Sequence, residues 1–234
     1  MTSLMLLPGL ACDAGLWRDI LPTLAGPRPV RVSTAHTRHA RLPAMARALL
    51  AQTPGPLLLA GASMGGMLAL EVWRQAPQRV RGLALLGTSA RADTPEWRAL
   101  RSQAIELFGA GRMEEVLRAN VLFAFHPLGA ARPGLVDDYL AMIRRAGAEQ
   151  LIRQNRAVMA REDRRAELPA ITCPVLVACG EADQITPPEH AREMAAAIPG
   201  ARLEIVPGAG HMLTMEQPAR VAKLLQAWLA SAAV

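Results

Sequence analysis

The chain has 234 residues, of which 51% are hydrophobic and 20% charged, and its formal net charge is +6. This length and apolar content predict one folded domain with a sizeable core and exclude a disordered chain. Nearly all the positive charge comes from arginines interleaved with acidic residues, and aromatic residues make up only 3%, which argues against a nucleic-acid partner.

The cysteines and the start of the sequence indicate in which cellular compartment the protein is expected. Cys12, Cys173 and Cys179 form neither an even set nor a Cys-x-x-Cys pair, so they predict neither a disulfide framework nor a zinc site. The first apolar run lacks a charged flank and breaks at Pro8, which makes it too short for a signal sequence or a membrane span. We expect a cytoplasmic protein with reduced thiols and no membrane contact.

Six short apolar runs, each bounded by turn residues, predict buried strands. Runs that are apolar throughout, and not alternating, are expected where helices cover both faces of a parallel sheet. In chain order the runs are 3–7, 29–33, 57–62, 82–86, 174–179 and 202–206.

Helical patterns lie between most of these runs. The pattern over 216–230 is the clearest, because Val221, Leu224, Leu225 and Trp228 fall on one helical face. The alternation of strand and helix predicts an α/β fold with a doubly wound, mainly parallel sheet. The predicted helices cover 43–52, 64–76, 188–198 and 216–230.

The stretch 91–168 breaks this rhythm, since it holds only helical patterns separated by glycine and proline. We interpret it as a helical lid inserted between two parts of the core, 1–90 and 169–234. Because it enters after one strand and leaves before the next, both ends are expected at the same edge of the sheet, above any site there.

A glycine-flanked serine carries the main chemical signal. The motif Gly61-Ala62-Ser63-Met64-Gly65 follows a predicted strand and opens a predicted helix. Small flanking residues allow the sharp turn that exposes a nucleophilic serine at the N-terminus of a helix, where the dipole favours negative charge. Ser63 is therefore the predicted nucleophile.

An acid and a histidine follow two later strands. Asp183 comes after the strand that ends at Cys179, and His211 comes after the strand that ends at 206. Loops at the carboxyl ends of parallel strands share one edge of the sheet, so we predict His211 as general base and Asp183 as the carboxylate that orients it. Asp93, after the strand 82–86, is the competing acid; Asp93-Thr94-Pro95 also fits a helix cap, and we favour Asp183.

The first strand runs into the loop Pro8-Gly9-Leu10-Ala11-Cys12. Such a loop can place a backbone N–H beside the nucleophile, and the residue after the nucleophile supplies a second. We predict an oxyanion hole formed by the backbone N–H groups of Leu10 and Met64. Cys12 is interpreted as a small hydrophobic loop residue.

These motifs together resemble the α/β-hydrolase superfamily over nearly the whole chain. Within it the chain is similar to the small capped esterases and lactonases, such as the pimeloyl-ester carboxylesterases and the 3-oxoadipate enol-lactone hydrolases. It has Pro8 and Ala62 where those proteins often have histidine. The resemblance implies a Ser-His-Asp triad and no cofactor.

Other candidate sites are weaker. His36 and His39 lack a nearby third ligand, so we interpret them as solvated loop residues and expect no metal. Gly208-Ala209-Gly210 has Leu213 in place of the third glycine of a dinucleotide fingerprint, and no nucleotide is expected.

Six residues are candidates for the substrate pocket because of their position in the insertion or beside the predicted acid and base. His126 is equally compatible with a substrate contact and with packing inside the lid. The candidates are Trp97, Phe123, Phe125, His126, Ile185 and Met212.

The sequence therefore predicts a serine hydrolase that cleaves a small carboxylic ester or lactone through an acyl-enzyme. One alternative is a non-hydrolytic protein of the same fold that binds or senses a small molecule. A carbon–carbon bond hydrolase or an acyltransferase with the same three residues is another. The fold by itself does not choose between these chemistries.

Overall fold

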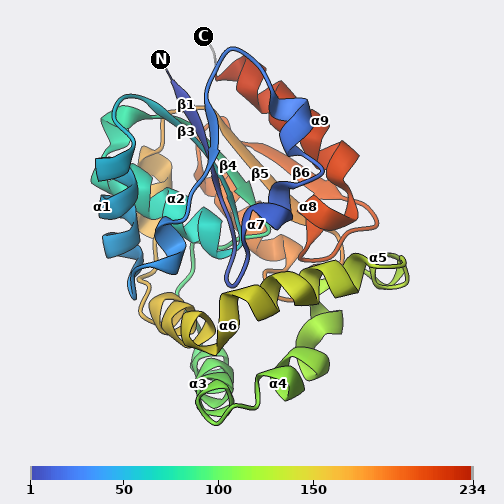
Figure 1. The fold of residues 1–234 in the computed structure, drawn as a ribbon. Helices are drawn as coiled ribbons and strands as arrows, with labels where there is room; N and C mark the ends of the chain where they lie inside the picture. Colours follow the sequence, from blue (N-terminus) through green and yellow to red (C-terminus); the bar gives the residue numbers. More distant parts are fainter. Residues whose placement is uncertain (1, 233–234) are drawn as a thin grey trace.

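The computed structural model describes residues 2–232, which form a six-stranded sheet in the order β2-β1-β3-β4-β5-β6 (Figure 1). Every neighbouring pair of strands is parallel. The predicted doubly wound parallel sheet is confirmed, and all six predicted strands lie within a few residues of the observed ones. The strands are β1 (Ser3–Leu7), β2 (Val30–Val32), β3 (Leu57–Ala62), β4 (Val80–Leu86), β5 (Val175–Gly180) and β6 (Arg202–Val206).

The apolar runs arise because both faces of the sheet are buried. Along β1, Leu4 and Leu6 belong to one core cluster, whereas Met5 and Leu7 belong to the other. Successive side chains point to opposite faces of a strand, so a strand covered on both sides has to be apolar at every position.

Helices cover each face. One cluster contains side chains of α1 (Leu42–Gln52), α2 (Met64–Gln75) and α7 (Pro188–Ala197). The other contains the apolar stripe of α9 (Pro218–Ser231), which follows the short helix α8 (Leu213–Glu216). The described residues also form six 3₁₀ helices: η1 (Ala14–Trp17), η2 (Leu21–Leu24), η3 (Ala35–Thr37), η4 (Pro77–Arg79), η5 (Val121–Ala124) and η6 (Arg165–Ala170).

Four α-helices lie between β4 and β5: α3 (Pro95–Gly109), α4 (Met113–Asn120), α5 (Pro127–Ala130) and α6 (Leu135–Met159). They lie beyond the carboxyl ends of the strands (Figure 1). Gly147 adopts φ 75° and ψ 167° within α6 and interrupts its helical geometry. A third core cluster, which includes Phe108, Leu117 and Leu140, holds these helices together and also takes in Ala11 from the loop after β1.

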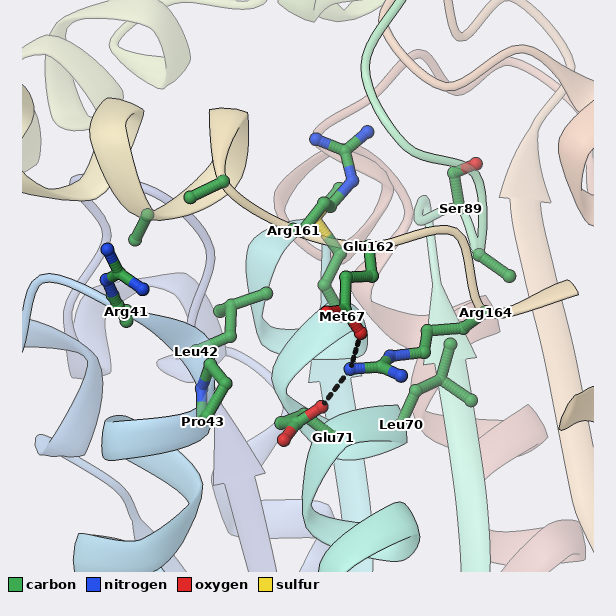
Figure 2. Close-up of a pocket in the computed structure, with 13 residues that line it drawn as sticks. Arg41, Leu42, Pro43, Met67, Leu70, Glu71, Ser89, Arg161, Glu162 and Arg164 are labelled. Carbon is green, nitrogen blue, oxygen red and sulfur yellow. Dashed lines mark hydrogen bonds and ion pairs between the residues drawn. The ribbon is translucent and has the colours of Figure 1, made fainter.

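An ionic cluster around the buried Glu71 ties the end of this helical segment to α2. The Glu71 carboxylate accepts hydrogen bonds from Arg74 and Gln75 at 2.7 Å and from Arg164 at 3.0 Å. Figure 2 shows Arg164 between Glu71 and Glu162 in a cavity of about 110 Å³ beside α1 and α2. Because these charges are paired with one another, the cluster has a structural role.

Among the described residues, no helix combines the length and the apolar character needed to cross a membrane.

Candidate active site

Ser63 lies at a sharp turn between β3 and α2 and has an unusual backbone conformation. Its φ of 53° and ψ of −118° are costly for a residue that has a Cβ. Two hydrogen bonds hold the turn: the Ser63 N–H donates to the Leu86 carbonyl at 2.9 Å, and Thr88 Oγ1 donates to the Ser63 carbonyl at 2.7 Å. The neighbouring strand β4 and the residues after it thus stabilise the exposed position of the hydroxyl.

The start of α2 packs against the end of β1, and only glycine fits at the contact. A Cβ at Gly65 would lie 2.0 Å from the Leu7 carbonyl oxygen, which is backbone and cannot swing aside. The close packing brings the first turn of α2 beside the loop that follows β1. Leu10 and Met64 both line the cavity next to Ser63, and neither backbone N–H has an acceptor among residues 2–232.

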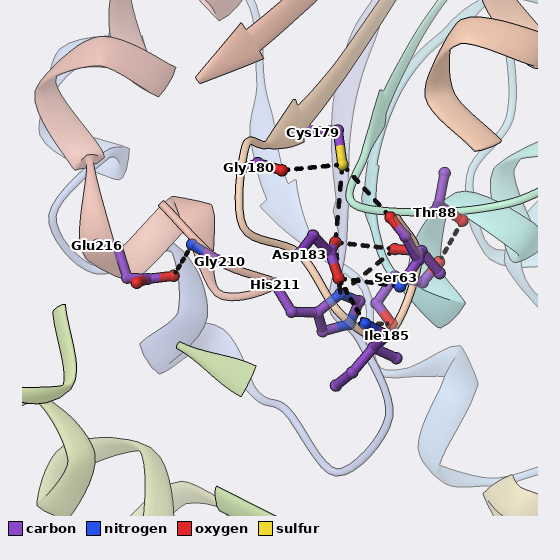
Figure 3. A network of polar contacts seen from close by, with 10 residues as sticks. Ser63, Thr88, Cys179, Gly180, Asp183, Ile185, Gly210, His211 and Glu216 are labelled. Atoms are coloured by element: carbon purple, nitrogen blue, oxygen red, sulfur yellow. Dashed lines mark hydrogen bonds and ion pairs between the residues drawn. The ribbon is translucent and has the colours of Figure 1, made fainter. Parts of the chain in front are cut away.

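Three side chains from three strand-end loops meet at this point (Figure 3). His211 Nε2 lies 2.9 Å from Ser63 Oγ, and His211 Nδ1 lies 2.9 Å from Asp183 Oδ2. The His211 side chain is 7% exposed and that of Asp183 is fully buried. This is the arrangement in which a carboxylate fixes an imidazole and the imidazole accepts a hydroxyl proton.

The Asp183 carboxylate is held by its own loop. Oδ1 accepts the backbone N–H groups of Ile185 and Thr186 at 2.9 Å, and Oδ2 accepts the Thr186 hydroxyl at 2.9 Å. Burial by itself raises the pKa of Asp183, but the charge and hydrogen bond of His211 and the two N–H donors outweigh it, so that the pKa is lowered. The carboxylate therefore stays ionised beside the imidazole.

Asp93, the competing acid, belongs to a different network. It is buried and pairs with Arg101 at 2.9 Å and with Arg161 at 2.7 Å. Thr94 is the N-cap of α3, and its hydroxyl accepts the Trp97 N–H at 3.3 Å. His211 has no contact with Asp93 among these interactions and is paired with Asp183.

Glu216 anchors the loop that carries His211. One carboxylate oxygen accepts the Gly210 N–H at 2.8 Å, and the other accepts the His126 N–H at 2.7 Å. Burial raises the pKa of Glu216, against the lowering effects of these two N–H donors and of the charges of His126 and Arg132. The side chain thus joins the histidine loop to the start of α5.

The cavity beside Ser63 has a volume of about 150 Å³, a size that accommodates a molecule such as benzene. Two of the six sequence-predicted pocket residues, Ile185 and Met212, line it. Phe125 is buried and packs edge-to-face on Tyr139 with ring centroids 5.3 Å apart. Phe125 and the remaining three residues all lie outside the cavity lining: Phe123 is 52% exposed, Trp97 lies beneath the Arg101 guanidinium, and His126 Nε2 is 3.8 Å from Glu181.

Cys12 also lines this cavity, in keeping with its predicted position in the loop after β1. Burial, and then the charge of Asp13, raise the pKa of the Cys12 thiol to about 12. The thiol therefore stays protonated and forms a small apolar part of the wall.

The interpretation of His36 as solvated is wrong. His36 is only 2% exposed, and its Nε2 lies 2.8 Å from the Cys12 carbonyl oxygen. Burial lowers the pKa of the imidazole, which favours the neutral ring. His39 is half-buried, and within residues 2–232 no three His, Cys, Asp or Glu side chains gather as metal ligands would.

Sequence reasoning missed several residues that shape the site. Gln154 of α6 is fully buried; its Oε1 accepts the Ala11 N–H at 2.7 Å, and its Nε2 donates to the His36 carbonyl at 2.9 Å. Gln154 thereby fixes the loop that carries Leu10, and no local pattern reveals this contact across 143 residues. The contact of Thr186 with Asp183, by contrast, could have been predicted from the sequence, because an aspartate in a turn commonly hydrogen-bonds to residues two or three positions later.

Curated relatives support the resemblance drawn from the motifs. The model of the alpha/beta hydrolase family matches residues 4–224. A pimeloyl-[acyl-carrier protein] methyl ester esterase of Neisseria meningitidis is 27% identical over 217 residues, which cover 88% of this chain and 84% of that protein. The dihydrolipoyllysine-residue acetyltransferase component of the acetoin cleaving system of Pseudomonas putida is 32% identical over 73% of this chain, but this chain spans only 45% of its length.

Solved structures agree. A thermophilic esterase from Thermogutta terrifontis, solved with malate bound, superimposes with a TM-score of 0.89 at 28% identity and covers 99% of this chain and 90% of its own. The enol-lactonase of Burkholderia xenovorans shares the fold with a TM-score of 0.84 at 24% identity, over 98% of this chain and 92% of its own. The chain belongs to the alpha/beta hydrolase family, with esterases and lactonases among the proteins it is similar to.

Proposed function

We propose that this protein hydrolyses small carboxylic esters or lactones through an acyl-enzyme formed on Ser63. The observation that carries the proposal is the continuous hydrogen-bonded chain from Ser63 Oγ to His211 Nε2 at 2.9 Å and from His211 Nδ1 to Asp183 Oδ2 at 2.9 Å. Esterase relatives of similar length support the same chemistry.

In the first half-reaction His211 Nε2 takes the hydroxyl proton while Ser63 Oγ attacks the carbonyl carbon. The carbonyl π electrons move onto oxygen, where the free N–H groups of Leu10 and Met64 stabilise the oxyanion. Collapse of this intermediate breaks the bond to the alcohol oxygen, which receives the proton from His211. Asp183 remains ionised throughout and stabilises the imidazolium.

In the second half-reaction water attacks the acyl carbon of the Ser63 ester. His211 takes a proton from the water and returns it to Ser63 Oγ as that oxygen leaves. The products are the carboxylic acid and the free enzyme. No other group is needed to balance the protons or electrons.

The test is steady-state turnover of p-nitrophenyl acetate and butyrate by wild type and by Ser63→Ala. We expect the substitution to lower kcat by several orders of magnitude, on the order of what loss of a triad serine costs. Ser89→Ala is the matched control, because Ser89 is buried just beyond the end of β4 and lies outside the Ser63 cavity; it is expected to retain most of the activity.

Equal turnover by wild type and Ser63→Ala would contradict the proposed nucleophile. Binding of esters without turnover in the wild-type protein would instead favour a small-molecule binder.

A further inference from the structure

One wall of the cavity beside Ser63 carries a permanent positive charge. Most residues of the lining are apolar or small, including Leu16, Met67, Val158 and Ile185. Arg101, from α3, is the only lysine or arginine in the lining that the structure describes. A guanidinium stays charged at any physiological pH, so this end of the cavity is cationic.

The Arg101 side chain is fixed in place and still has donor capacity. Nε donates to Asp93 Oδ2 at 2.9 Å, and Nη1 donates to Asn155 Oδ1 at 2.9 Å. The guanidinium also lies over the Trp97 ring, 5.8 Å from its centroid. The side chain is only 18% exposed, and its third nitrogen, Nη2, has no hydrogen-bond partner among residues 2–232.

The charges around Asp93 do not balance. Asp93 pairs with Arg161 as well as with Arg101, and the side chains of Asp93 and Arg161 are 3% and 9% exposed. Asn155 is neutral, and the guanidinium of the nearby Arg98 donates to the Asp93 carbonyl at 3.4 Å. One carboxylate therefore pairs with two guanidinium groups, of which Arg161 is 9% and Arg101 18% exposed, and within residues 2–232 one of these positive charges has no carboxylate of its own.

An excess buried charge is costly unless a partner compensates it. This cost affects Arg161, whose pKa is lowered mainly by burial. The charge and hydrogen bond of Asp93 raise the pKa, whereas the charges of Arg101 and Arg98 lower it further. A bound anion that reached Nη2 from the cavity would remove this excess. The planar, fixed guanidinium suits a carboxylate in particular.

Tyr139 offers a second donor to the same cavity. It lines the wall, and its hydroxyl has no partner within the described part of the chain. Burial, and then the neighbouring Cys12, raise its pKa, so the hydroxyl keeps its proton and remains a donor at neutral pH.

We propose that Arg101 binds a carboxylate of the substrate, and that the preferred substrates of the Ser63 esterase proposed above are therefore small esters or lactones that carry a carboxylate group. The half-esters of short dicarboxylic acids are the simplest members of this class. The cavity of about 150 Å³ suits a short-chain acid. Arg101 is thus a specificity-determining residue that contacts the substrate away from the reacting carbonyl.

The kinetic test compares monomethyl succinate, glutarate and adipate with the methyl esters of the corresponding monoamides, which have the same shape without the charge. For at least one length we expect the carboxylate ester to have a kcat/KM about tenfold to a hundredfold higher, the range given by one charge-assisted hydrogen bond. In Arg101→Gln this preference should fall to within about twofold, mostly through KM, because the carboxylate esters lose more than the neutral esters do.

Two further variants separate a contact from a general effect of charge. Arg101→Lys keeps the cation and should keep part of the preference for the carboxylate. Arg98→Gln removes an exposed charge one turn earlier on α3, outside the cavity lining, and should leave the preference intact. Equal rates for acid and amide esters in wild type, or an equal loss of both in Arg101→Gln, would overturn the proposed contact.

A binding measurement keeps the test independent of turnover. Succinate, glutarate and adipate are added to Ser63→Ala and to the double variant Ser63→Ala/Arg101→Gln, and Tm is recorded. At least one diacid should raise the Tm of the single variant and leave the double variant unchanged, because only a ligand that binds the folded state stabilises it. If no diacid distinguishes the two proteins, Arg101 is not a carboxylate site. If the wild-type protein turned over no ester, the proposed Ser63 chemistry would be refuted, but a Tm shift that depends on Arg101 would still show a carboxylate site.

Discussion

At the scale of single residues, the site depends on a serine in a conformation that few residues with a side chain adopt. Ser63 has φ 53° and ψ −118°, and its backbone N–H and carbonyl are both held by groups at or beyond the end of β4. Packing therefore maintains a strained turn that presents the hydroxyl to His211. Strain of this kind typically costs about 1–3 kcal/mol.

This strain predicts that Ser63→Gly is more stable than Ser63→Ala by about 1 kcal/mol, because glycine adopts positive φ without a Cβ clash. The gain is partly offset because a glycine loses more conformational entropy on folding than an alanine does. Both variants lack the hydroxyl and its hydrogen bond to His211, so the comparison isolates the backbone. Urea unfolding at one pH gives the two free energies. An alanine variant at least as stable as the glycine variant would show that the turn is not strained.

At the scale of elements, close packing between a helix terminus and a strand end aligns the proposed oxyanion donors. The first turn of α2 approaches the end of β1 at Gly65, and Gln154 of α6 holds the loop after β1 through the Ala11 N–H. Leu10 lies in the loop after β1 and Met64 is the first residue of α2. The Gly65 contact positions the helix against β1, and the Gln154 hydrogen bond positions the loop.

Gly65→Ala is expected to lower the free energy of unfolding by about 2 kcal/mol or more and to reduce ester turnover. Its Cβ would lie 2.0 Å from backbone atoms of β1, and neither element can shift without disturbing the core. Gly109→Ala is the control, since Gly109 is the last residue of α3 and no heavy atom lies within 4 Å of a Cβ added there. If chemical denaturation gives equal losses for the two variants, the contact between α2 and β1 does not constrain the site.

At the scale of the whole molecule, buried titratable groups make stability depend on pH. Burial lowers the pKa of His36 in the folded state, so as the pH falls below about 6.5 the unfolded chain takes up a proton before the folded chain does. Burial, and then the charge of Arg91, lower the pKa of His190 with the same sign. The raised pKa of Glu216 acts in the opposite direction.

His36→Gln is therefore expected to lose less stability than wild type between pH 7.5 and pH 5.5. The amide can still donate to the Cys12 carbonyl but does not titrate, and Glu216 and His190 are present in both proteins, so the difference isolates His36. The free energy of unfolding in urea is measured at both pH values. An identical change in wild type and variant would mean that His36 protonates equally in the folded and unfolded states.

Much of the fold and the core of the proposed site could be predicted because the relevant information is local. The strands are apolar at every position since both faces of the sheet are buried, and the alternation with helices then dictates parallel pairing. A parallel sheet places its strand-end loops at one edge. Ser63, Asp183 and His211 could therefore be grouped from their positions along the chain.

Only the tertiary structure decided which other side chains complete the site. Three of these side chains lie on helices between β4 and β5: Arg101, Tyr139 and Gln154. Helical periodicity shows which side chains share a face of a helix, but not whether that face points to the cavity. The same limit applies to the burial of His36 beneath the loop after β1. The sequence by itself determined the sheet and the edge where the proposed site lies, because strand burial and strand-end loops leave a local pattern. The walls and charge of the cavity depend on how separate helices pack, as in the contact of Arg101 on α3 with Asn155 on α6; the loop after β1 is likewise held by Gln154, 143 residues away from Ala11.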